Sequence, residues 1–438
     1  MQLTDTVSTG VNKRSLEESR AYLRRSEGLI PCHTQTLSKG PTQFVQGYSP
    51  IYLARGEGSH VFDVDGNEYI DYPLALGPIT LGHNYPAVTE AIIRQVKDGI
   101  TFSLIHPLEV ELAEELREVI PCCEAVRYSK TGSEVTSAAV RIARAHTGRN
   151  IVASQGYHGW HEWFATTTER RDGIPEVMNE LIKTFEYNDI ESLKRIFEKY
   201  PDDVACVIME PVCVEEPRGN FLEEVREICN HYKSVLIFDE IVTGFRMALG
   251  GAQEYYGVIP DMATFGKGMA NGMPLSVVVG KWEVMKAAER AFFSTTFGGE
   301  AVSMAACKAT IREMKEKNVI DHLWNVGGRL QSEYNRLAEK YNIPSRCIGL
   351  APHTAFAFQD DDGEVSYPLK SLFLRETIKR GILFSGVQNV SFSHTDGDLD
   401  YTIKAIEESF EFISEILKLG KLDEEIGDKV VWPVFRNL

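Results

Sequence analysis

Short hydrophobic runs, each bounded by polar or glycine-containing sequence, recur through the middle of this chain. Residues 151–154, 204–209 and 235–238 have the length and largely apolar character of strands buried in an α/β sheet. Residues 109–119 instead repeat with the period of an amphipathic helix, and a second helix is predicted over 135–147. The pattern therefore predicts an α/β domain.

The N-terminal part of the chain has a different pattern. Residues 51–75 predict two or three short antiparallel strands, with a tight turn at Asp65-Gly66-Asn67. A short helix is predicted ahead of them, over residues 15–25. These elements indicate a part of the protein built separately from the central sheet.

Two of the predicted strands end in residues that carry chemistry. Asp239 and Glu240 follow the run 235–238, and the stretch 261–265 ends in Gly266-Lys267-Gly268, which places Lys267 28 positions after Asp239 (267 − 239). Ligands of open parallel sheets gather at the carboxyl ends of the strands. We therefore expect the acid and the lysine to lie at the ends of adjacent strands.

One cofactor needs this pair of side chains. Pyridoxal phosphate (PLP) is held by a lysine Schiff base, while a carboxylate keeps its pyridinium nitrogen protonated. Glycines on both sides of Lys267 would allow close approach of the backbone. On spacing alone, a surface lysine in a glycine-rich loop and an acid capping a strand are equally open alternatives.

Composition narrows the classes of partner. With 438 residues the chain is long enough for two or more domains. Its net charge of −17 argues against nucleic acid or an anionic membrane as the partner, so an anionic substrate would need basic residues of its own. The eight cysteines form no CxxC motif, so no metal site is indicated and reduced thiols are expected. Without an apolar leader or a long apolar stretch, we expect a cytoplasmic protein.

The stretch from Val235 to Gly280 carries a family resemblance. D-E-I-V-T-G-F-R, beginning at Asp239, and G-K-G-M-A-N-G-M-P, beginning at Gly266, resemble class III (fold-type I) PLP-dependent aminotransferases, particularly the glutamate-1-semialdehyde aminomutase branch. The resemblance extends over roughly residues 50–415. It implies a large α/β domain with a mostly parallel seven-stranded sheet and a smaller α+β domain built from both termini. The implied division is 1–50 as an N-terminal arm, 51–100 and 326–438 as the small domain, and 101–325 as the PLP-binding domain.

The same resemblance assigns roles to individual residues. Lys267 would form the Schiff base and act as general base, Asp239 would keep the ring nitrogen protonated, and Tyr157 of the Y-H-G motif would stack on the ring. The strand-to-helix turn at Gly132 is a candidate anion site, although many such turns look alike. A threonine would bind the phosphate of the other subunit, which implies a homodimer with shared sites. The predicted cofactor contacts are Thr131, Gly132, Ser133, Tyr157, His158, Glu210, Asp239, Ile241, Lys267 and Thr296.

Some positions depart from the family pattern. Lys39 stands opposite an arginine that holds the substrate carboxylate in the aminomutases, and a lysine is a point charge rather than a bidentate fork. Glu215 replaces an asparagine and Val242 a glutamine, which leaves the partner of the PLP O3′ atom unassigned. The aromatic W-H-E-W-F segment is expected to line the substrate entrance. The predicted substrate contacts are Lys39, Trp160 and Glu215.

Three functions follow from these observations. The favoured one is a transaminase that moves an amino group from an amino acid, glutamate first, to an aldehyde or ketone of a small biosynthetic substrate, sugar-derived substrates included. An intramolecular aminomutase of the glutamate-1-semialdehyde type, or a racemase of the same fold, is the alternative, and the changes at Lys39 and Glu215 weigh against the exact semialdehyde reaction. A catalytically silent scaffold with this fold would be expected to lack Lys267 or Asp239, and both are present.

Overall fold

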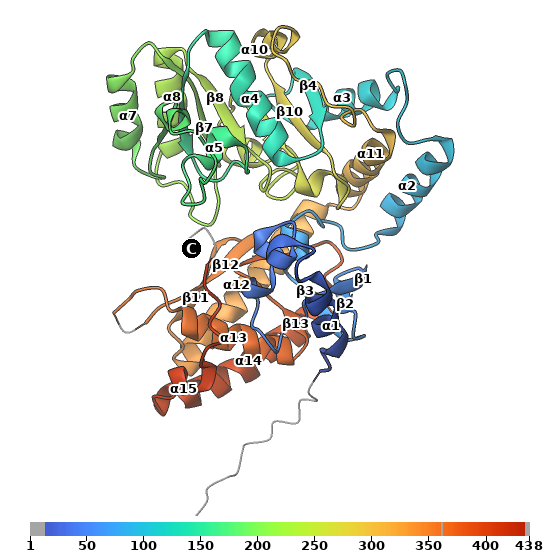
Figure 1. Ribbon diagram of the computed structural model, residues 1–438, viewed down its shortest axis with the longest axis vertical. Helices are drawn as coiled ribbons and strands as arrows, with labels where there is room; N and C mark the ends of the chain where they lie inside the picture. The colour runs from blue at the N-terminus through green and yellow to red at the C-terminus, as the bar shows by residue number, and fades with distance from the viewer. Residues whose placement is uncertain (1–13, 361, 434–438) are drawn as a thin grey trace, which may run out of the picture. The chain divides into compact units, whose positions relative to one another are not determined.

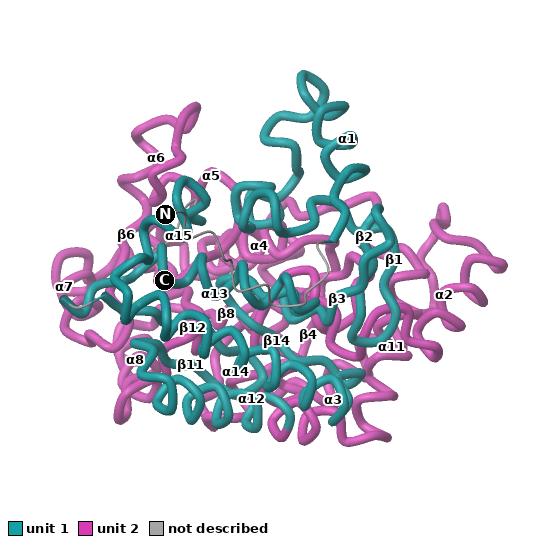
Figure 2. The backbone as a smooth tube through the Cα atoms, turned by 90° about the horizontal axis from the view of Figure 1, so that it is seen from below, with its two compact units in different colours: residues 1–73, 326–438 teal, residues 74–325 magenta. Residues whose placement is uncertain are grey.

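The computed structural model describes residues 14–360 and 362–433. Two compact units divide the chain: unit 1 comprises residues 1–73 and 326–438, and unit 2 comprises residues 74–325 (Figure 2). The division falls inside helix α12 (Val319–Tyr341). The four-part domain division made from the sequence stays a prediction.

Unit 2 is built on a seven-stranded sheet in the order β4-β10-β9-β8-β7-β5-β6 (Figure 1). Strand β10 is antiparallel to both of its neighbours, and the strands from β9 to β6 are mutually parallel. This arrangement confirms the predicted mostly parallel sheet. The strands are β4 (Ala125–Ser129), β5 (Ile151–Gln155), β6 (Ile182–Thr184), β7 (Val204–Met209), β8 (Val235–Asp239), β9 (Met262–Phe265) and β10 (Ser276–Gly280).

Helices flank this sheet because their apolar faces need a partner. Helix α4 packs Val135, Ala139 and Ile142 into the same apolar core as Ile208 and Ile237 of the sheet. The other helices of unit 2 are α2 (Pro86–Asp98), α3 (Leu108–Val119), α5 (Glu162–Ala165), α6 (Val177–Glu180), α7 (Ile190–Lys199), α8 (Phe221–Tyr232), α9 (Ala252–Tyr256), α10 (Trp282–Met285) and α11 (Ala301–Glu316).

Helix α4 (Gly132–Thr147) begins three residues before the predicted start at Val135. The carboxylate of Glu134 accepts hydrogen bonds from the backbone N–H groups of Lys130 (3.0 Å) and Thr131 (2.9 Å). Glu134 and Thr131 form a reciprocal capping box, which fixes the start of the helix at Gly132. Thr131 is the N-cap residue.

Unit 1 contains two small sheets. The first has the order β1-β2-β3-β13, in which β1 to β3 are antiparallel, as predicted for residues 51–75, and β13 is parallel to β3. The second has the order β11-β12-β14 and is antiparallel. None of the described helices is long and apolar enough to cross a membrane. The elements are α1 (Glu17–Ser26), β1 (Leu53–Glu57), β2 (His60–Asp63), β3 (Glu68–Asp71), β11 (Ser345–Leu350), β12 (His353–Phe358), α13 (Tyr367–Lys379), β13 (Ile382–Leu383), β14 (Val387–Asn389), α14 (Asp396–Lys418) and α15 (Leu422–Ile426).

Candidate active site

One edge of the seven-stranded sheet collects most of the predicted cofactor residues. Strands β5, β7, β8 and β9 are parallel, so their carboxyl ends meet at this edge. Strand β4 is antiparallel to β10, which is antiparallel to β9, so β4 ends at the same edge. The segments that leave these ends carry the turn at Thr131, the Y-H-G motif, Glu210, Asp239 and Lys267. The sheet topology therefore brings together residues that are scattered along the sequence.

Asp239 is held by three hydrogen-bond donors. Its Oδ1 atom accepts from the backbone N–H of Ile241 (3.2 Å) and from the hydroxyl of Thr264 (3.1 Å). Its Oδ2 atom lies 2.7 Å from Nδ1 of His158. A carboxylate offers about four acceptor positions, so three fixed donors orient the group and leave one position for a further donor.

His158 is buried, and both of its ring nitrogens are engaged. Nε2 lies 2.8 Å from the carbonyl oxygen of Gln155, which can only accept, so Nε2 carries a proton. One further proton must lie between Nδ1 and the Asp239 carboxylate, which makes that hydrogen bond charge-assisted. The indole of Trp163 stacks on the imidazole, with an interplanar angle of 13° and 5.9 Å between centroids. His158 therefore fixes the orientation of the Asp239 carboxylate.

Lys267 follows directly from β9, the strand that pairs with β8. The register places Thr264 opposite Asp239, three residues before Lys267. The backbone of Lys267 is left-handed, with φ of 42°, a conformation that costs a non-glycine residue about 1–3 kcal/mol. Strain of this kind persists where the surrounding packing fixes the backbone. The next residue, Gly268, packs against Thr80 so closely that a Cβ atom on Gly268 would lie 2.5 Å from the Thr80 hydroxyl. The structure confirms that the acid and the lysine lie at the ends of adjacent strands.

The turn before α4 has the geometry of an anion site. The backbone N–H groups of Gly132 and Ser133 belong to the first turn of the helix, where no carbonyl of the helix can reach them. Burial by itself raises the pKa of Glu134, but hydrogen bonds from Ser129 and from two backbone N–H groups lower it below its ordinary value. The Glu134 carboxylate is thus tied to the preceding turn, and the helix N-terminus remains available to a phosphate.

The Y-H-G segment packs directly on this turn. The hydroxyl oxygen of Ser133 accepts from the backbone N–H of Trp160 (3.2 Å), and Gly159 lies so close that a Cβ atom there would be 2.8 Å from Cα of Ser133. The backbone N–H of Tyr157 donates to Glu210 (2.8 Å). The phenol ring of Tyr157 is 40% exposed and meets Phe164 edge-on. The ring is therefore accessible at the same sheet edge.

The remaining predicted residues lie in different places. Thr296 is exposed in the loop before α11, and Trp160 is 74% exposed. Glu215 is also exposed, where it pairs with Arg218 (2.7 Å) and accepts from Asn188 (3.0 Å). Lys39 belongs to unit 1, in a 3₁₀ helix at Leu37–Lys39.

Sequence reasoning missed two contributors to the site. Thr264 is the one polar residue in the apolar strand M-A-T-F, and this signal was available in the sequence. Gly159 is required by its close contact with Ser133, 26 residues away, which no local pattern reveals. The role of His158 as a support for Asp239 also depends on a contact across the sheet.

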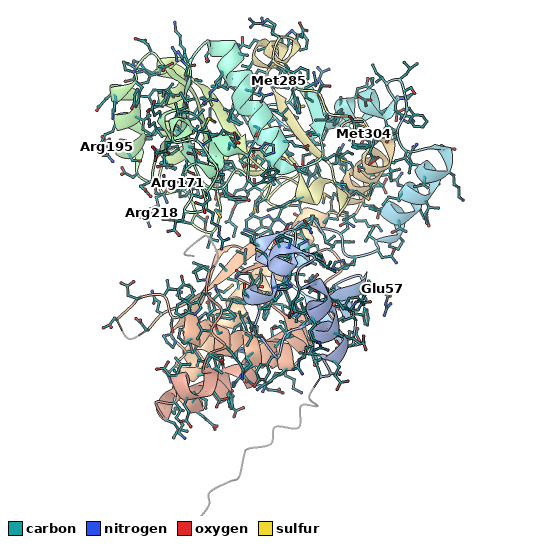
Figure 3. All side chains as sticks on the ribbon, in the orientation of Figure 1. Glu57, Arg171, Arg195, Arg218, Met285 and Met304 are labelled. Carbon is teal, nitrogen blue, oxygen red and sulfur yellow. The ribbon has the colours of Figure 1, made fainter. Side chains whose placement is uncertain are left out.

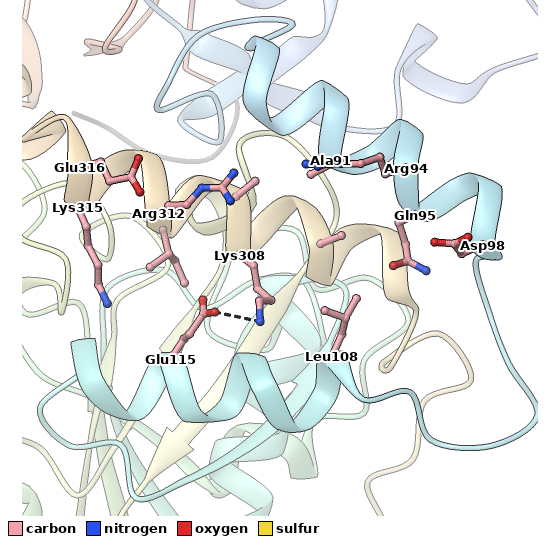
Figure 4. A pocket seen from close by; sticks show the side chains of 13 residues that line it. Ala91, Arg94, Gln95, Asp98, Leu108, Glu115, Lys308, Arg312, Lys315 and Glu316 are labelled. Atoms are coloured by element: carbon pink, nitrogen blue, oxygen red, sulfur yellow. Dashed lines mark ion pairs between the residues drawn. The ribbon is translucent and has the colours of Figure 1, made fainter.

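A concavity on unit 2 lies between α2, α3 and α11 and has a volume of 520 Å³ (Figure 4). Its central cation, Lys308, pairs with Glu111 (2.6 Å) and Glu115 (3.0 Å), both on α3. Lys308 is thus held in ion pairs by two carboxylates, so we place the candidate site at the sheet edge that holds Asp239 and Lys267.

Comparison with known proteins supplies the family. The model of the class III aminotransferase family matches residues 44–408, most of the chain. The chain belongs to the class III aminotransferases. This confirms the enzyme class and the fold predicted from the sequence, and with them pyridoxal phosphate as the cofactor.

Three proteins that the chain resembles differ in their named activities. The chain is 37% identical to 3-aminobutyryl-CoA aminotransferase of Cloacimonas acidaminovorans (strain Evry), over 92% of this chain and 99% of that protein. It is 34% identical to glutamate-1-semialdehyde 2,1-aminomutase of Persephonella marina, over 83% of this chain and 92% of that protein. Among solved structures, FumI of Sphingopyxis sp. MTA144 with PLP as its internal aldimine has a TM-score of 0.86 and 26% identity, covering 91% and 97% of the two chains.

The residues at the sheet edge fit this cofactor. Asp239 keeps one acceptor position, as a pyridine N–H requires, and the first turn of α4 offers N–H groups to a phosphate. Next to Lys267, a Cβ atom at Gly266 would lie 2.8 Å from the hydroxyl of Ser276 and 3.1 Å from Cδ1 of Ile241, so a glycine is needed there.

Proposed function

We propose that this enzyme exchanges an amino group between an amino acid, glutamate first, and the carbonyl carbon of a small 3-oxoacyl thioester. The observation that carries the proposal is the 37% identity, over nearly the full length of both chains, to an aminotransferase named for 3-aminobutyryl-CoA. Glutamate as donor and a ketone as acceptor agree with the exchange predicted from the sequence.

The side chains at the sheet edge would divide the work. Bound PLP supplies a ring that withdraws electrons from the carbon that bears the amino group. Asp239, held by His158 and Thr264, would keep the ring nitrogen protonated, and the Lys267 amine would hold the cofactor and then move the proton at the reacting carbon. The N–H groups of Gly132 and Ser133 would bind the phosphate.

The remaining predicted residues are assigned as follows. The exposed ring of Tyr157 suits stacking on the cofactor, and Ile241 would pack against its other side. The hydroxyls of Thr131 and Thr296 and the carboxylate of Glu210 would complete the cofactor contacts. Lys39, Trp160 and Glu215 stay predicted substrate contacts.

Exposed apolar side chains support the predicted homodimer. Leu104 and Ile105 are 85% and 79% exposed between α2 and α3, and Ile100, Phe102 and Phe297 are also exposed. Apolar surface of this extent in unit 2 is typical of a protein interface, so a second copy of the chain is the occupant we propose. Sedimentation should give twice the mass of one chain, and Leu104→Glu should shift the protein toward the monomer.

An intramolecular aminomutase is the second candidate function, because a relative of that name is 34% identical to this chain. The two functions differ in what a single amine does to the cofactor. In a transaminase one amine, without any acceptor, converts the yellow enzyme completely to its pyridoxamine form. An aminomutase moves an amino group within one substrate, so a separate donor amino acid such as glutamate should leave the cofactor unchanged.

The deciding experiment titrates the holoenzyme with single amines and records its absorbance. Loss of the yellow band with glutamate or a 3-aminoacyl thioester, and its return with a 3-oxoacyl thioester, is the expected result. A band that is indifferent to all of these compounds, but is changed by glutamate-1-semialdehyde, would replace the proposal with the aminomutase.

A further inference from the structure

Three arginines surround one exposed turn of unit 2. Arg127 of β4 donates to the carbonyl of Phe293 (2.6 Å), and its guanidinium lies 5.3 Å from the centre of that ring. Arg141 of α4 donates to the carbonyl of Phe292 (2.6 Å). Arg290, at the start of the turn, donates to the carbonyl of Ala145 at the end of α4 (3.3 Å). We call Arg127, Arg141 and Arg290 the arginine patch.

The arginine patch carries positive charge without an ion-pair partner in the described part of the chain. None of its arginines forms an ion pair with a carboxylate among residues 14–360 and 362–433, although the chain has a net charge of −17. Each side chain is exposed, and each uses one N–H on a backbone carbonyl. A guanidinium has five N–H donors, so each arginine is positioned by the fold and keeps donors for a ligand.

Helix α4 connects the patch to the cofactor site. Ser133, Ser137 and Arg141 are spaced four residues apart and so lie on one face of the helix. Ser133 is at the proposed phosphate turn, and Arg141 lies about 12 Å further along at 1.5 Å per residue. The hydroxyl of Ser137 lies 2.7 Å from Nδ1 of His161, which follows the exposed Trp160. Burial is the largest cause that lowers the pKa of His161, and the charge on Arg141 lowers it further.

We propose that the arginine patch binds the phosphate groups of the nucleotide end of a CoA thioester substrate. This inference rests on the proposed function, because a CoA thioester carries several phosphates at the end of a long arm, away from the reacting carbon. Arginine is suited to phosphate because its planar fork donates two parallel hydrogen bonds. Phe292, whose ring is 82% exposed within the same turn, offers a face on which the purine base can stack.

Paired thioesters test the proposal. The holoenzyme is assayed with 3-aminobutyryl-CoA and with the same acyl group on N-acetylcysteamine, which lacks the nucleotide and its phosphates. We expect Arg141→Gln and Arg290→Gln each to lower kcat/KM for the CoA thioester about tenfold, through KM, as loss of a hydrogen bond to a charged group predicts. The kcat/KM for the short thioester should not change, and Arg141→Lys should recover part of the loss.

Two further measurements guard against indirect effects. Arg195→Gln is the control, because Arg195 is also exposed but lies on α7. In Figure 3 it is well apart from Met285, a residue shortly before the turn that the arginine patch surrounds. In addition, 3′-phosphoadenosine 5′-diphosphate should compete with the CoA thioester on the wild-type enzyme, and added salt should weaken this competition.

Either of two results would overturn the inference while leaving the aminotransferase intact: equal turnover of the two thioesters by the wild type, or equal losses for both in the variants. If neither thioester is an amine donor but another amine is, the thioester substrate and this inference both fail. No amine transfer to or from any substrate would remove the proposed function as well.

Discussion

Replacing Gly159 with alanine should damage the phosphate site without touching any group that performs chemistry. Gly159 has φ of 100°, a conformation that disfavours a side chain, and it packs against Ser133 at the start of α4. A methyl group there would place its carbon 2.1 Å from Oγ, 2.7 Å from Cβ and 2.8 Å from Cα of Ser133. One of the two segments must therefore move.

The size of the effect follows from these contacts. Carbon atoms pack at about 3.5 Å, so the segments must separate by roughly 0.7 Å. Such a shift would carry the Trp160 N–H···Ser133 contact, now 3.2 Å, past the length of a hydrogen bond. Positive φ and overpacking each cost about 1–3 kcal/mol. If the displaced turn loses one charge-assisted hydrogen bond to the phosphate, PLP binds about ten- to a hundredfold more weakly.

The assay is the equilibrium binding of PLP to the apoprotein, measured by absorbance, together with the midpoint of urea unfolding. Gly148→Ala is the matched control, because Gly148 also has positive φ (72°) but has open space around its missing Cβ, at the opposite end of α4. The control should lose about 1 kcal/mol of stability and bind PLP normally. The reasoning would be refuted if Gly159→Ala bound PLP as tightly as the wild type, or if both variants weakened binding equally.

Three other predictions concern the catalytic pair, its support and a histidine far from it in the sequence. Lys267→Ala should lower kcat at least about a thousandfold while the protein stays folded, as checked by single-turnover kinetics and circular dichroism. His158→Leu should lower the free energy of unfolding of the apoprotein in urea by about 3 kcal/mol, because it leaves the buried Asp239 without one of its donors. His158→Asn should recover part of this loss, and equal losses in the two variants would argue against the hydrogen bond. Burial lowers the pKa of His394 to about 4, so the unfolded chain binds the extra proton first. Stability present above pH 6.5 should be lost progressively toward pH 4, by about 3 kcal/mol. In His394→Gln that part of the pH dependence of unfolding should disappear.

The sequence alone was enough to predict where Asp239 and Lys267 lie in the sheet. Apolar runs of four to six residues mark strands buried on both faces, and a polar residue at the end of such a run lies at the end of a strand. The prediction that Asp239 and Lys267 lie at the ends of adjacent strands was therefore possible without coordinates. Family motifs supplied the rest of the assignment, including PLP and the seven-stranded sheet.

Contacts between distant segments were decided only by the tertiary structure. His158 meets Asp239 across 81 residues, and Gly159 fits against Ser133 across 26, because the order of strands in the sheet brings their ends together. The start of α4 shifted for a local reason, since Glu134 reaches back to N–H groups ahead of the helix. The arginine patch likewise depends on the turn at Phe292 folding between β4 and α4. Local patterns record propensity and periodicity, whereas strand order and side-chain packing are properties of the whole fold, and these set the surroundings of every residue in the site.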